Sequence, residues 1–360
     1  MLQWNLSRIT TFTETDLSIP YWIGVDVHKR SYHVALHRSD GEHLTWVTSA
    51  EPQTFANQLL SLPVTIRAVA YESGPTGFGL ARTLNQVGIP VIVAAPSRVP
   101  RAVRPGAKSD RLDCIKLAEH AARGMLKCIA IPDEDDEALR ALLRRRHQLT
   151  KSLRRAKQRI KSFLLLFGIP EPTGLDHWSI RSKESLAELQ LGPVHQSTLA
   201  SMIRQMKYVE EEQKIVIAQV KSYITESGLG DQVDFLTSIP GVGPITALTF
   251  QLEIFNPGRF NRAEELTGYL GLAPMVHHSG EKTPSGRLQA VGQKCLRSLL
   301  VEAAWIWKTR DEGARLLYNR LLAKSGIPQK AICAVARRLA IILWRIAVEK
   351  RPYYPIQQPI

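Results

Sequence analysis

The sequence predicts an α/β domain at the N-terminus, then a long helical middle region, then a mostly helical C-terminal domain. Up to residue 132, short apolar and β-branched segments alternate with helical segments. From residue 133 onward, apolar residues recur at helical spacing over much longer stretches. A chain of 360 residues is long enough for two or three domains, each with a core of its own.

The predicted α/β domain covers residues 21–132. Its expected strands lie at 21–29, 31–38, 44–49, 65–73, 89–96 and 126–132, and its expected helices at 52–61, 74–88 and 109–124, the last with Ser109 as its N-cap. A hairpin-type turn, "DGEH" (40–43), makes the first three strands an antiparallel meander. Strict strand–helix alternation and a GxGxxG after the first strand are both absent, which excludes a dinucleotide-binding fold.

The segments on either side of this domain differ in character. Residues 1–20 are polar and lack the apolar stretch of a signal peptide, so we expect a loose N-terminal arm. Residues 133–230 predict a helix at 133–168, a break at 169–174 and two further helical stretches within 183–227. Long antiparallel helices of this kind form a coiled-coil-like arm, which is a common means of dimerisation.

The C-terminal domain is expected over residues 231–350, with a tail at 351–360. Its helices are predicted near 262–270, 290–308, 312–324 and 328–349. The segment "SIPGVGPITA" (238–247) resembles a helix-hairpin-helix turn, in which Gly241 and Gly243 let the backbone approach a phosphate. A plain tight turn between core helices is the alternative interpretation.

The charge balance favours a polyanionic partner. The chain carries 47 Lys and Arg against 33 Asp and Glu, for a net charge of +14. Nucleic acid is the first expectation and an acidic membrane surface the second, while a solvated basic surface is the alternative. Ten Lys and Arg with no acid lie between Arg140 and Lys161, and such a run repels itself unless a polyanion lies along it. The nucleic-acid-binding residues predicted from this run are Arg144, Arg145, Arg146, Lys151, Arg154, Arg155, Lys157, Arg159 and Lys161.

Other classes of protein are disfavoured by composition. The 4 cysteines are far apart and form no CxxC pair, which argues against a zinc site and against a secreted disulfide scaffold. A reducing, cytoplasmic compartment is therefore expected. The longest apolar runs fall short of the roughly 18 residues that a membrane-spanning helix needs.

Four acids are the candidate metal ligands. Asp26 lies within the apolar strand "IGVDVHK", and Glu72 ends the strand "VAYE" of the same expected sheet. Asp110 and Asp113 share one face of a helix because they are three residues apart. Each acid alone is equally typical of a solvated strand end or helix surface. Together they need divalent cations to stay ionised side by side, and Mg²⁺ prefers carboxylate and water oxygens. This placement in a mixed sheet resembles the RNase H/RuvC-like nuclease core.

Six segments in order resemble bacterial insertion-sequence transposases of the IS-one-ten family. They are "GVDVHK", "AYESGPTGFGLARTL", "KSDRLDCIKLAE", "SIPGVGPITA", "YLGLAP" and "RSLLVEAAW", and the similarity spans roughly residues 21–345. Members are DEDD recombinases with a RuvC-like N-terminal domain and a helical transposase domain. The resemblance implies that the DEDD acids are Asp26, Glu72, Asp110 and Asp113 and that they hold Mg²⁺.

The resemblance also implies a serine nucleophile that forms a phosphoserine link to DNA. The family's serine follows a GLxP turn, which places it at Ser279 in "GLAPMVHHSGEKTPSG". Ser285 repeats the Ser-Gly dipeptide six residues later and stays an alternative. His278 stands where many members have a second serine. Carboxylate-bound Mg²⁺ activates such a hydroxyl. Lys282, with His277 and His278, is a candidate phosphate contact, although ordinary loop polarity explains all three equally well.

The partners implied by the family are donor DNA, target DNA and a structured non-coding RNA, the bridge RNA, whose loops pair with both DNAs. Members act as homodimers that pair into tetramers, with composite sites built from two subunits, in the bacterial cytoplasm at the nucleoid. Two other hypotheses stay open. One is a Holliday-junction-resolvase-like endonuclease that needs the acids and water but no serine. The other is a non-catalytic nucleic-acid-binding protein, which leaves the four acids without a role.

Overall fold

The chain consists of two compact units, residues 1–131 and residues 132–360, in a computed structural model. The structure describes residues 2–13, 19–100, 110–274, 288 and 292–355.

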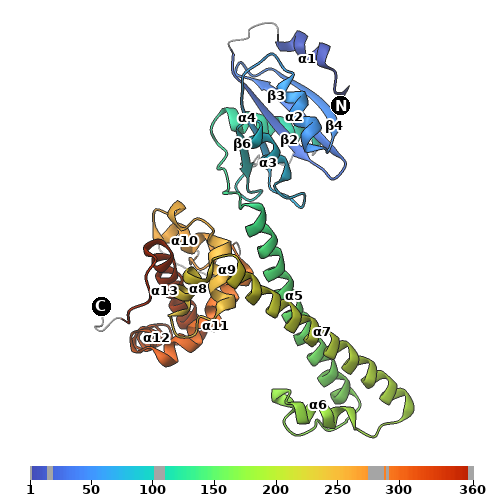
Figure 1. Ribbon diagram of the computed structural model, residues 1–360, viewed down its shortest axis with the longest axis vertical. Helices are drawn as coiled ribbons and strands as arrows, with labels where there is room; N and C mark the ends of the chain where they lie inside the picture. Colours follow the sequence, from blue (N-terminus) through green and yellow to red (C-terminus); the bar gives the residue numbers. More distant parts are fainter. Residues whose placement is uncertain (1, 14–18, 101–109, 275–287, 289–291, 356–360) are drawn as a thin grey trace, which may run out of the picture. The chain divides into compact units, whose positions relative to one another are not determined.

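The first unit contains a six-stranded sheet with the strand order β1-β4-β3-β2-β5-β6 (Figure 1). Its strands are β1 (Leu2–Gln3), β2 (Tyr21–Val27), β3 (Ser31–Arg38), β4 (His43–Ser49), β5 (Ile66–Glu72) and β6 (Val91–Ala94). Strands β2, β3 and β4 form the predicted antiparallel meander. Strand β5 lies parallel to β2, and β6 lies parallel to β5, so the sheet is mixed as expected.

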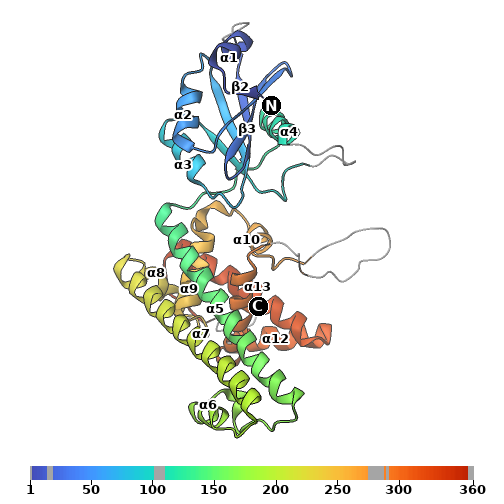
Figure 2. The same ribbon diagram turned by 90° about the vertical axis from the view of Figure 1, so that its right-hand side faces the viewer.

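Two helices cover one face of this sheet and a single helix covers the other (Figure 2). Helices α2 (Pro52–Leu60) and α3 (Gly79–Gln86) lie on one face, and α4 (Asp110–Ala122) lies on the other. Because side chains alternate along a strand, every second residue of β2, β3 and β5 points toward α2 and α3. The apolar residues at these positions, among them Ile23, Val34 and Val69, form the main core of the unit together with side chains such as Phe55 and Leu84.

The opposite face carries a row of small residues beneath α4. Ala35 of β3 and Ala70 of β5 both pair with Gly24 of β2. A Cβ atom placed on Gly24 would lie 1.9 Å from the carbonyl oxygen of Cys114 in α4. The helix therefore packs directly on the backbone of the central strand, which only glycine at position 24 permits.

Two expectations for this unit are overturned. The first residues are not a loose arm, because β1 pairs with β4 and α1 (Leu6–Thr13) packs on the unit. Ile9 is 2% exposed, and the Trp4 and Trp46 ring centroids lie 5.5 Å apart, so apolar side chains hold the segment in place. No strand forms at 126–132, where Cys128 makes a single bridge to Ala94. Strand β6 is only 4 residues long and offers little edge for further pairing.

The second unit contains a long antiparallel helical hairpin, here called the arm. It consists of α5 (Glu134–Leu166) and α7 (Pro193–Glu226), with the short helices η1 (Leu175–His177) and α6 (Ile180–Ala187) between them (Figure 1). Asp133 caps α5, since its side chain accepts a 2.7 Å hydrogen bond from the Asp136 amide. Near α6, the arm has its own small core, which includes Ile160 and Met206.

The rest of this unit is a helical bundle. Its elements are α8 (Gly230–Thr237), α9 (Pro244–Ile254), η2 (Pro257–Arg259), α10 (Ala263–Tyr269), α11 (Lys294–Arg310), α12 (Glu312–Ser325) and α13 (Pro328–Glu349). Leu139 and Leu143 of α5 and Val220 of α7 belong to the same core as the bundle. The base of the arm and the bundle are therefore a single packed body. Among the described helices, none has the length and apolar character needed to cross a membrane.

The packing of α4 on Gly24 yields a stability prediction. Gly24→Ala is expected to destabilise the full-length protein by about 1–3 kcal/mol, because the new methyl group must displace α4. Gly79→Ala is the matched control, since Gly79 is exposed in the first turn of α3 and a methyl group there would meet nothing within 4 Å. Urea unfolding followed by circular dichroism measures both. Equal midpoints for Gly24→Ala and wild type would contradict the close packing of α4 on this strand.

Candidate active site

The next row of the sheet on the α4 face is polar. Moving two residues along each strand from the row of small residues leads to His33, Asp26 and Glu72. His33 pairs directly with Asp26 across the antiparallel ladder. Glu72 follows Tyr71, whose partner is Val25, so Glu72 occupies the same row on the neighbouring parallel strand. Strand alternation directs all three side chains to the face that α4 covers.

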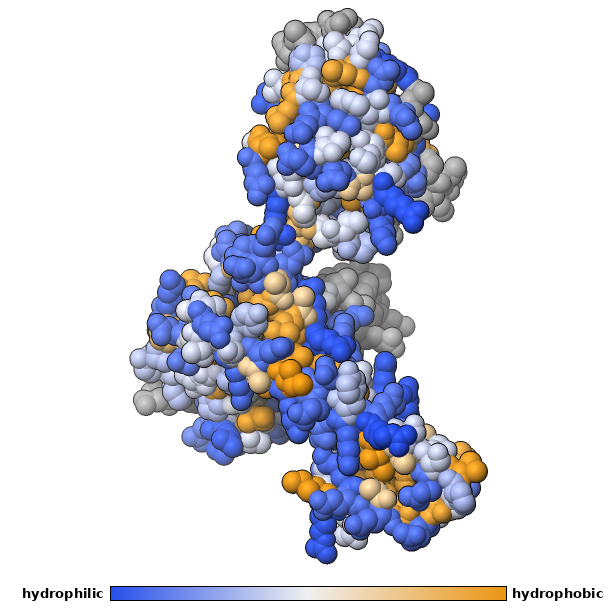
Figure 3. Space-filling view, turned by 45° about the vertical axis from the view of Figure 1, so that its right-hand side comes forward, coloured by the Kyte–Doolittle hydropathy of each residue, from blue (hydrophilic) through white to orange (hydrophobic). Residues whose placement is uncertain are grey.

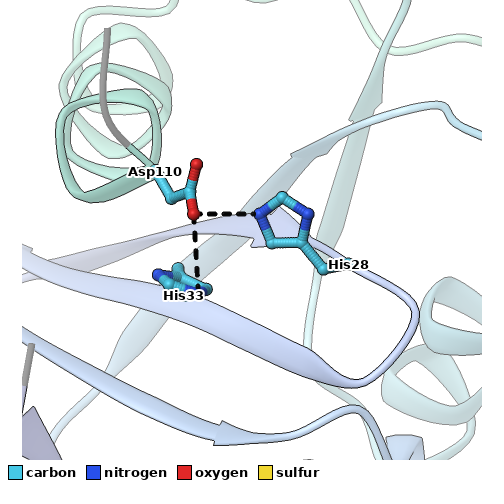
Figure 4. Close-up of side chains that lie close together, drawn as sticks. All are labelled: His28, His33 and Asp110. Carbon is cyan, nitrogen blue, oxygen red and sulfur yellow. Dashed lines mark ion pairs between the residues drawn. The ribbon is translucent and has the colours of Figure 1, made fainter.

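The first turn of α4 brings Asp110 to this row (Figure 4). The Oδ2 atom of Asp110 lies 3.5 Å from Nε2 of His28 and 3.8 Å from Nε2 of His33. The same Nε2 atom of His28 lies 3.2 Å from Oδ2 of Asp26. His28 is the first residue after β2, and its amide donates to the Ser31 carbonyl to close the hairpin. Two acids and two imidazoles thus converge at one end of the central strands.

The acids of this cluster influence one another electrostatically. Burial raises the pKa of Asp26, whose side chain is only 26% exposed. The nearby charges of Asp110 and Asp113 raise that pKa further, whereas His28 lowers it. Burial also raises the pKa of the Cys114 thiol to about 12, and Asp26 and Asp113 contribute to this rise. Three of the four predicted acids are therefore close enough to repel each other, which a bound cation would relieve.

Glu72 is the fourth predicted acid. It lies in the same row of the sheet, but it is exposed at the end of β5. Asp113 is also partly exposed, and one of its carboxylate oxygens lies 4.0 Å from Nζ of Lys116. His28 and His33 were not predicted from the sequence as members of the cluster. Their signal was present, since a tight hairpin centred between Lys29 and Arg30 pairs position 26 with position 33.

The donor atoms present fit a divalent cation. Carboxylate oxygens and imidazole nitrogens are common metal ligands, and one atom each of His28, His33 and Asp110 lies within 4.8 Å of the other two. Such a cation would stabilise the charge of the crowded acids and of a phosphate brought beside them. The fold holds the carboxylate oxygens and imidazole nitrogens of this cluster close together above the sheet.

Ser279, Ser285, Lys282, His277 and His278 lie outside the residues that the structure describes. The ends of their segment are placed. Pro274 and Leu288 form an antiparallel bridge, so the chain leaves and returns at the same point. Gly292, with φ +95°, packs so closely on the turn after α10 that a Cβ atom would lie 2.5 Å from the amide nitrogen of Gly271. We call the residues between 274 and 292 the serine segment.

Comparison with known proteins decides the family. A family model described as a transposase matches residues 23–169, and one described as the transposase IS116/IS110/IS902 family matches residues 233–319. The protein y4qE of Sinorhizobium fredii, named as a transposase, is 32% identical over 92% of this chain and 89% of its own length. The chain belongs to the IS110 family of transposases.

Further relatives of this transposase cover from about two thirds to nine tenths of its chain. The transposase for insertion sequence element IS1328 of Yersinia enterocolitica is 27% identical over 91% of this chain and 96% of its own. The pilin gene-inverting protein of Moraxella bovis is 25% identical over 68% of each chain. Membership makes this protein an insertion-sequence transposase with DNA as its substrate. The DEDD type of its N-terminal family model also indicates dependence on a divalent metal.

A buried ion pair joins the arm of the transposase to the base of the serine segment. Glu253 of α9 is 5% exposed and accepts a 2.8 Å hydrogen bond from Arg140 of α5. Arg144, one turn along, lies 3.4 Å from the other oxygen of Glu253. The Tyr269 hydroxyl donates to the Glu253 carbonyl at 3.0 Å and lies 3.5 Å from the side-chain nitrogen of Gln293. The basic helix is thus held beside Tyr269 and Gln293, which precede and follow the serine segment in the sequence.

Several basic residues of α5 lie near the start of α11, as their effect on the pKa of Cys295 indicates. Burial raises the pKa of the Cys295 thiol, in the first turn of α11, and Glu253 raises it further. Arg146, Lys151 and Arg144 lower that pKa, so their charges lie close to the start of α11. The nucleic-acid-binding residues predicted at positions 144, 146 and 151 therefore flank the return of the serine segment into the bundle.

Further along α5, the predicted basic residues divide into two groups. Arg145, Arg154, Arg155 and Arg159 are exposed on the arm. Lys161 lies 2.9 Å from Glu171 and 2.8 Å from Asp176, and these acids offset its charge. Lys157 lies 5.2 Å from the Trp178 ring centroid, a cation–π contact within the arm. The exposed arginines of the first group therefore add positive charge to the surface of the arm, whereas the charge of Lys161 is offset.

The two glycines of the predicted helix-hairpin-helix turn differ in environment. Gly241 has φ +90°, and a Cβ atom on it would lie 2.8 Å from the Ala303 carbonyl oxygen in α11. Its lack of a side chain therefore serves packing between α9 and α11. Gly243 is exposed and caps α9, whose first residue is Pro244. Contact of this turn with phosphate stays a prediction.

The buried ion pair yields the second prediction. Glu253→Gln is expected to lower the free energy of unfolding by about 3–5 kcal/mol, because the guanidinium of Arg140, 10% exposed, is left without its charged partner. Glu211→Gln is the matched control, since Glu211 pairs with Lys214 at 3.2 Å on the exposed surface of α7. Its expected cost is below about 1 kcal/mol. Urea unfolding of both variants measures the difference, and equal costs would refute the role given to burial.

Proposed function

We propose that this transposase cleaves and rejoins DNA strands through the hydroxyl of Ser279, beside Mg²⁺ held by Asp26, Glu72, Asp110 and Asp113. The observation that carries the metal site is the convergence of Asp26 and Asp110 over the central strands, with Asp113 near enough to raise the pKa of Asp26. The pinned base of the serine segment beside basic side chains supports the assignment of the nucleophile to this region.

The chemistry proceeds by exchange of phosphate esters. The Ser279 oxygen attacks the phosphorus of a DNA strand, the bond to the 3′ oxygen breaks, and the proton lost by serine is taken up by that oxygen. The 5′ phosphate then stays bound to the protein as a phosphoserine. Attack by the 3′ hydroxyl of another strand reverses these bond changes, restores the serine and joins the new strands. A cation held by the four acids would supply charge stabilisation for the pentacoordinate phosphorus.

The proposed partners are donor DNA, target DNA and the bridge RNA, with the RNA pairing to both DNAs. The exposed arginines of the arm support contact with their phosphates. A homodimer that assembles into a tetramer would complete the site with residues from two copies. Apolar side chains gather at the end of the arm (Figure 3). The exposed apolar residues of this part of the chain include Leu165, Leu166, Ile180 and Val194, and they support contacts between copies.

A resolvase-like endonuclease that uses water is the alternative function. It needs the same acids and is compatible with the cluster around Asp26, but it releases cut strands. The relative from Moraxella bovis is named for inverting a gene. A DNA segment can be inverted only when all cut strands are rejoined, which favours strand exchange over hydrolysis for the present protein.

The nucleophile is tested by trapping it. Purified protein with Mg²⁺, bridge RNA, donor DNA and target DNA is expected to form a covalent protein–DNA adduct on a denaturing gel. Ser279→Ala should abolish the adduct, because no other hydroxyl replaces the attacking oxygen, and Ser285→Ala should retain it. The reverse pattern would assign the nucleophile to Ser285. Cleavage with free 5′ phosphate and no adduct in wild type would support the water-dependent endonuclease instead.

The nucleic-acid role of the arm is tested by salt dependence. Replacing Arg154, Arg155 and Arg159 together by Gln should weaken binding to duplex DNA. It should also reduce the slope of log affinity against log salt by about 0.9 for each phosphate that the variant no longer binds. Lys161→Gln is the control, because Glu171 and Asp176 already offset its charge. Fluorescence anisotropy over a salt series measures the slopes. An unchanged slope in the triple variant would place the nucleic acid elsewhere.

A further inference from the structure

We propose that His28 and His33 bind the divalent cation together with Asp26 and Asp110, so that the site favours Mn²⁺ and similar transition metals over Mg²⁺. The inference rests on the metal site of the proposed function and names two further ligands for it. An all-carboxylate site would leave both imidazoles as neighbours of the metal. The positions of their nitrogens argue that they are part of it.

Two of the three separations between donor atoms match those of a shared cation, and the third is slightly longer. Ligands about 2.0–2.2 Å from one ion lie about 2.8–3.1 Å apart at neighbouring octahedral positions and about 3.3–3.6 Å apart in tetrahedral geometry. The Nε2 atom of His28 lies 3.2 Å from an oxygen of Asp26 and 3.5 Å from an oxygen of Asp110. The Nε2 atom of His33 lies 3.8 Å from that same Asp110 oxygen. Both imidazoles present the same ring nitrogen to the acids.

The fold holds the two imidazoles in this arrangement. His33 is fixed by the β3 ladder directly opposite Asp26, and its side chain is 20% exposed. His28 is fixed by the closed hairpin after β2, and its ring meets that of His33 edge to face at 5.2 Å between centroids. Because both come from the hairpin of β2 and β3, they move with Asp26 as one body, and only Asp110 comes from another element.

The chemistry of the ligands sets the preference among cations. Mg²⁺ takes oxygen ligands in strict octahedral geometry and usually keeps several waters. Imidazole nitrogen suits first-row transition metals, whose affinity for nitrogen ligands exceeds that of Mg²⁺. Two imidazoles beside two carboxylates should therefore raise affinity for Mn²⁺ without a matching gain for Mg²⁺. The competing explanation is that the imidazoles only form hydrogen bonds or ion pairs with the acids.

The test uses full-length protein with Mn²⁺ and Mg²⁺ as the probes. Pulsed electron paramagnetic resonance of the Mn²⁺-loaded protein should detect coupling to imidazole nitrogen. His28→Ala should weaken that coupling and lower Mn²⁺ affinity by about tenfold or more, with little change for Mg²⁺ in calorimetry. His33→Gln should do the same. His43→Ala is the control, because His43 is exposed and pairs with His37 at the far end of the sheet.

Asp26→Asn separates this inference from the proposed function. If Asp26→Asn abolishes Mn²⁺ binding while wild type shows no nitrogen coupling, the carboxylate site stands and the role of the imidazoles is refuted. Equal losses of Mn²⁺ and Mg²⁺ affinity in His28→Ala would also refute the preference. If Asp26→Asn and His28→Ala both bind Mn²⁺ as wild type does, the metal lies elsewhere, and the metal site of the proposed function fails as well.

Discussion

The close approach of α4 to the central strand is the contact on which the candidate site depends. Gly24 lets the backbone of α4 lie directly on the sheet. Its neighbours in the same row, Ala35 and Ala70, have small side chains that leave room for the helix. Because α4 is a rigid helix, this contact also fixes its first turn above Asp26, which lies two residues after Gly24 on β2. A larger side chain at position 24 would lift the helix and carry Asp110 away from the acids and imidazoles of the sheet.

A buried ion pair has the corresponding role in the second unit. Glu253 binds Arg140 in the packed interior, and the backbone of the same residue accepts the hydroxyl of Tyr269. One residue therefore fixes both the start of the basic helix and the turn that leads into the serine segment. Such a pair adds little net stability over apolar packing, but breaking it is costly, so it specifies one arrangement of these elements.

In the cluster around Asp26, unlike the paired Glu253, a carboxylate lies where its charge is unfavourable for the folded protein. Burial and two neighbouring acids raise the pKa of this carboxyl, which means that its charged form is disfavoured in the folded protein without a cation. A position with that property is typical of sites kept for chemistry. The two imidazoles lower the pKa of Asp26, so they partly relieve the repulsion even before any metal binds.

Local pattern alone determined the elements with strong periodicity: the meander of β2, β3 and β4, the long helix α5 and the place of the DxxD pair on α4. It failed where long-range packing decides. At the N-terminus, the ring of Trp4 packs on that of Trp46, and near residue 128 Cys128 pairs with a single strand residue, Ala94. The sequence also suggested the four acids from their places on two strands and one helix, before any family resemblance, and it showed Glu253 and His33 only as isolated residues. Only the tertiary structure showed that Glu253 pairs with Arg140 and that His33 lies beside Asp110. The physical reason is that the distance between side chains of different elements depends on how closely α4 and α5 pack on their neighbours.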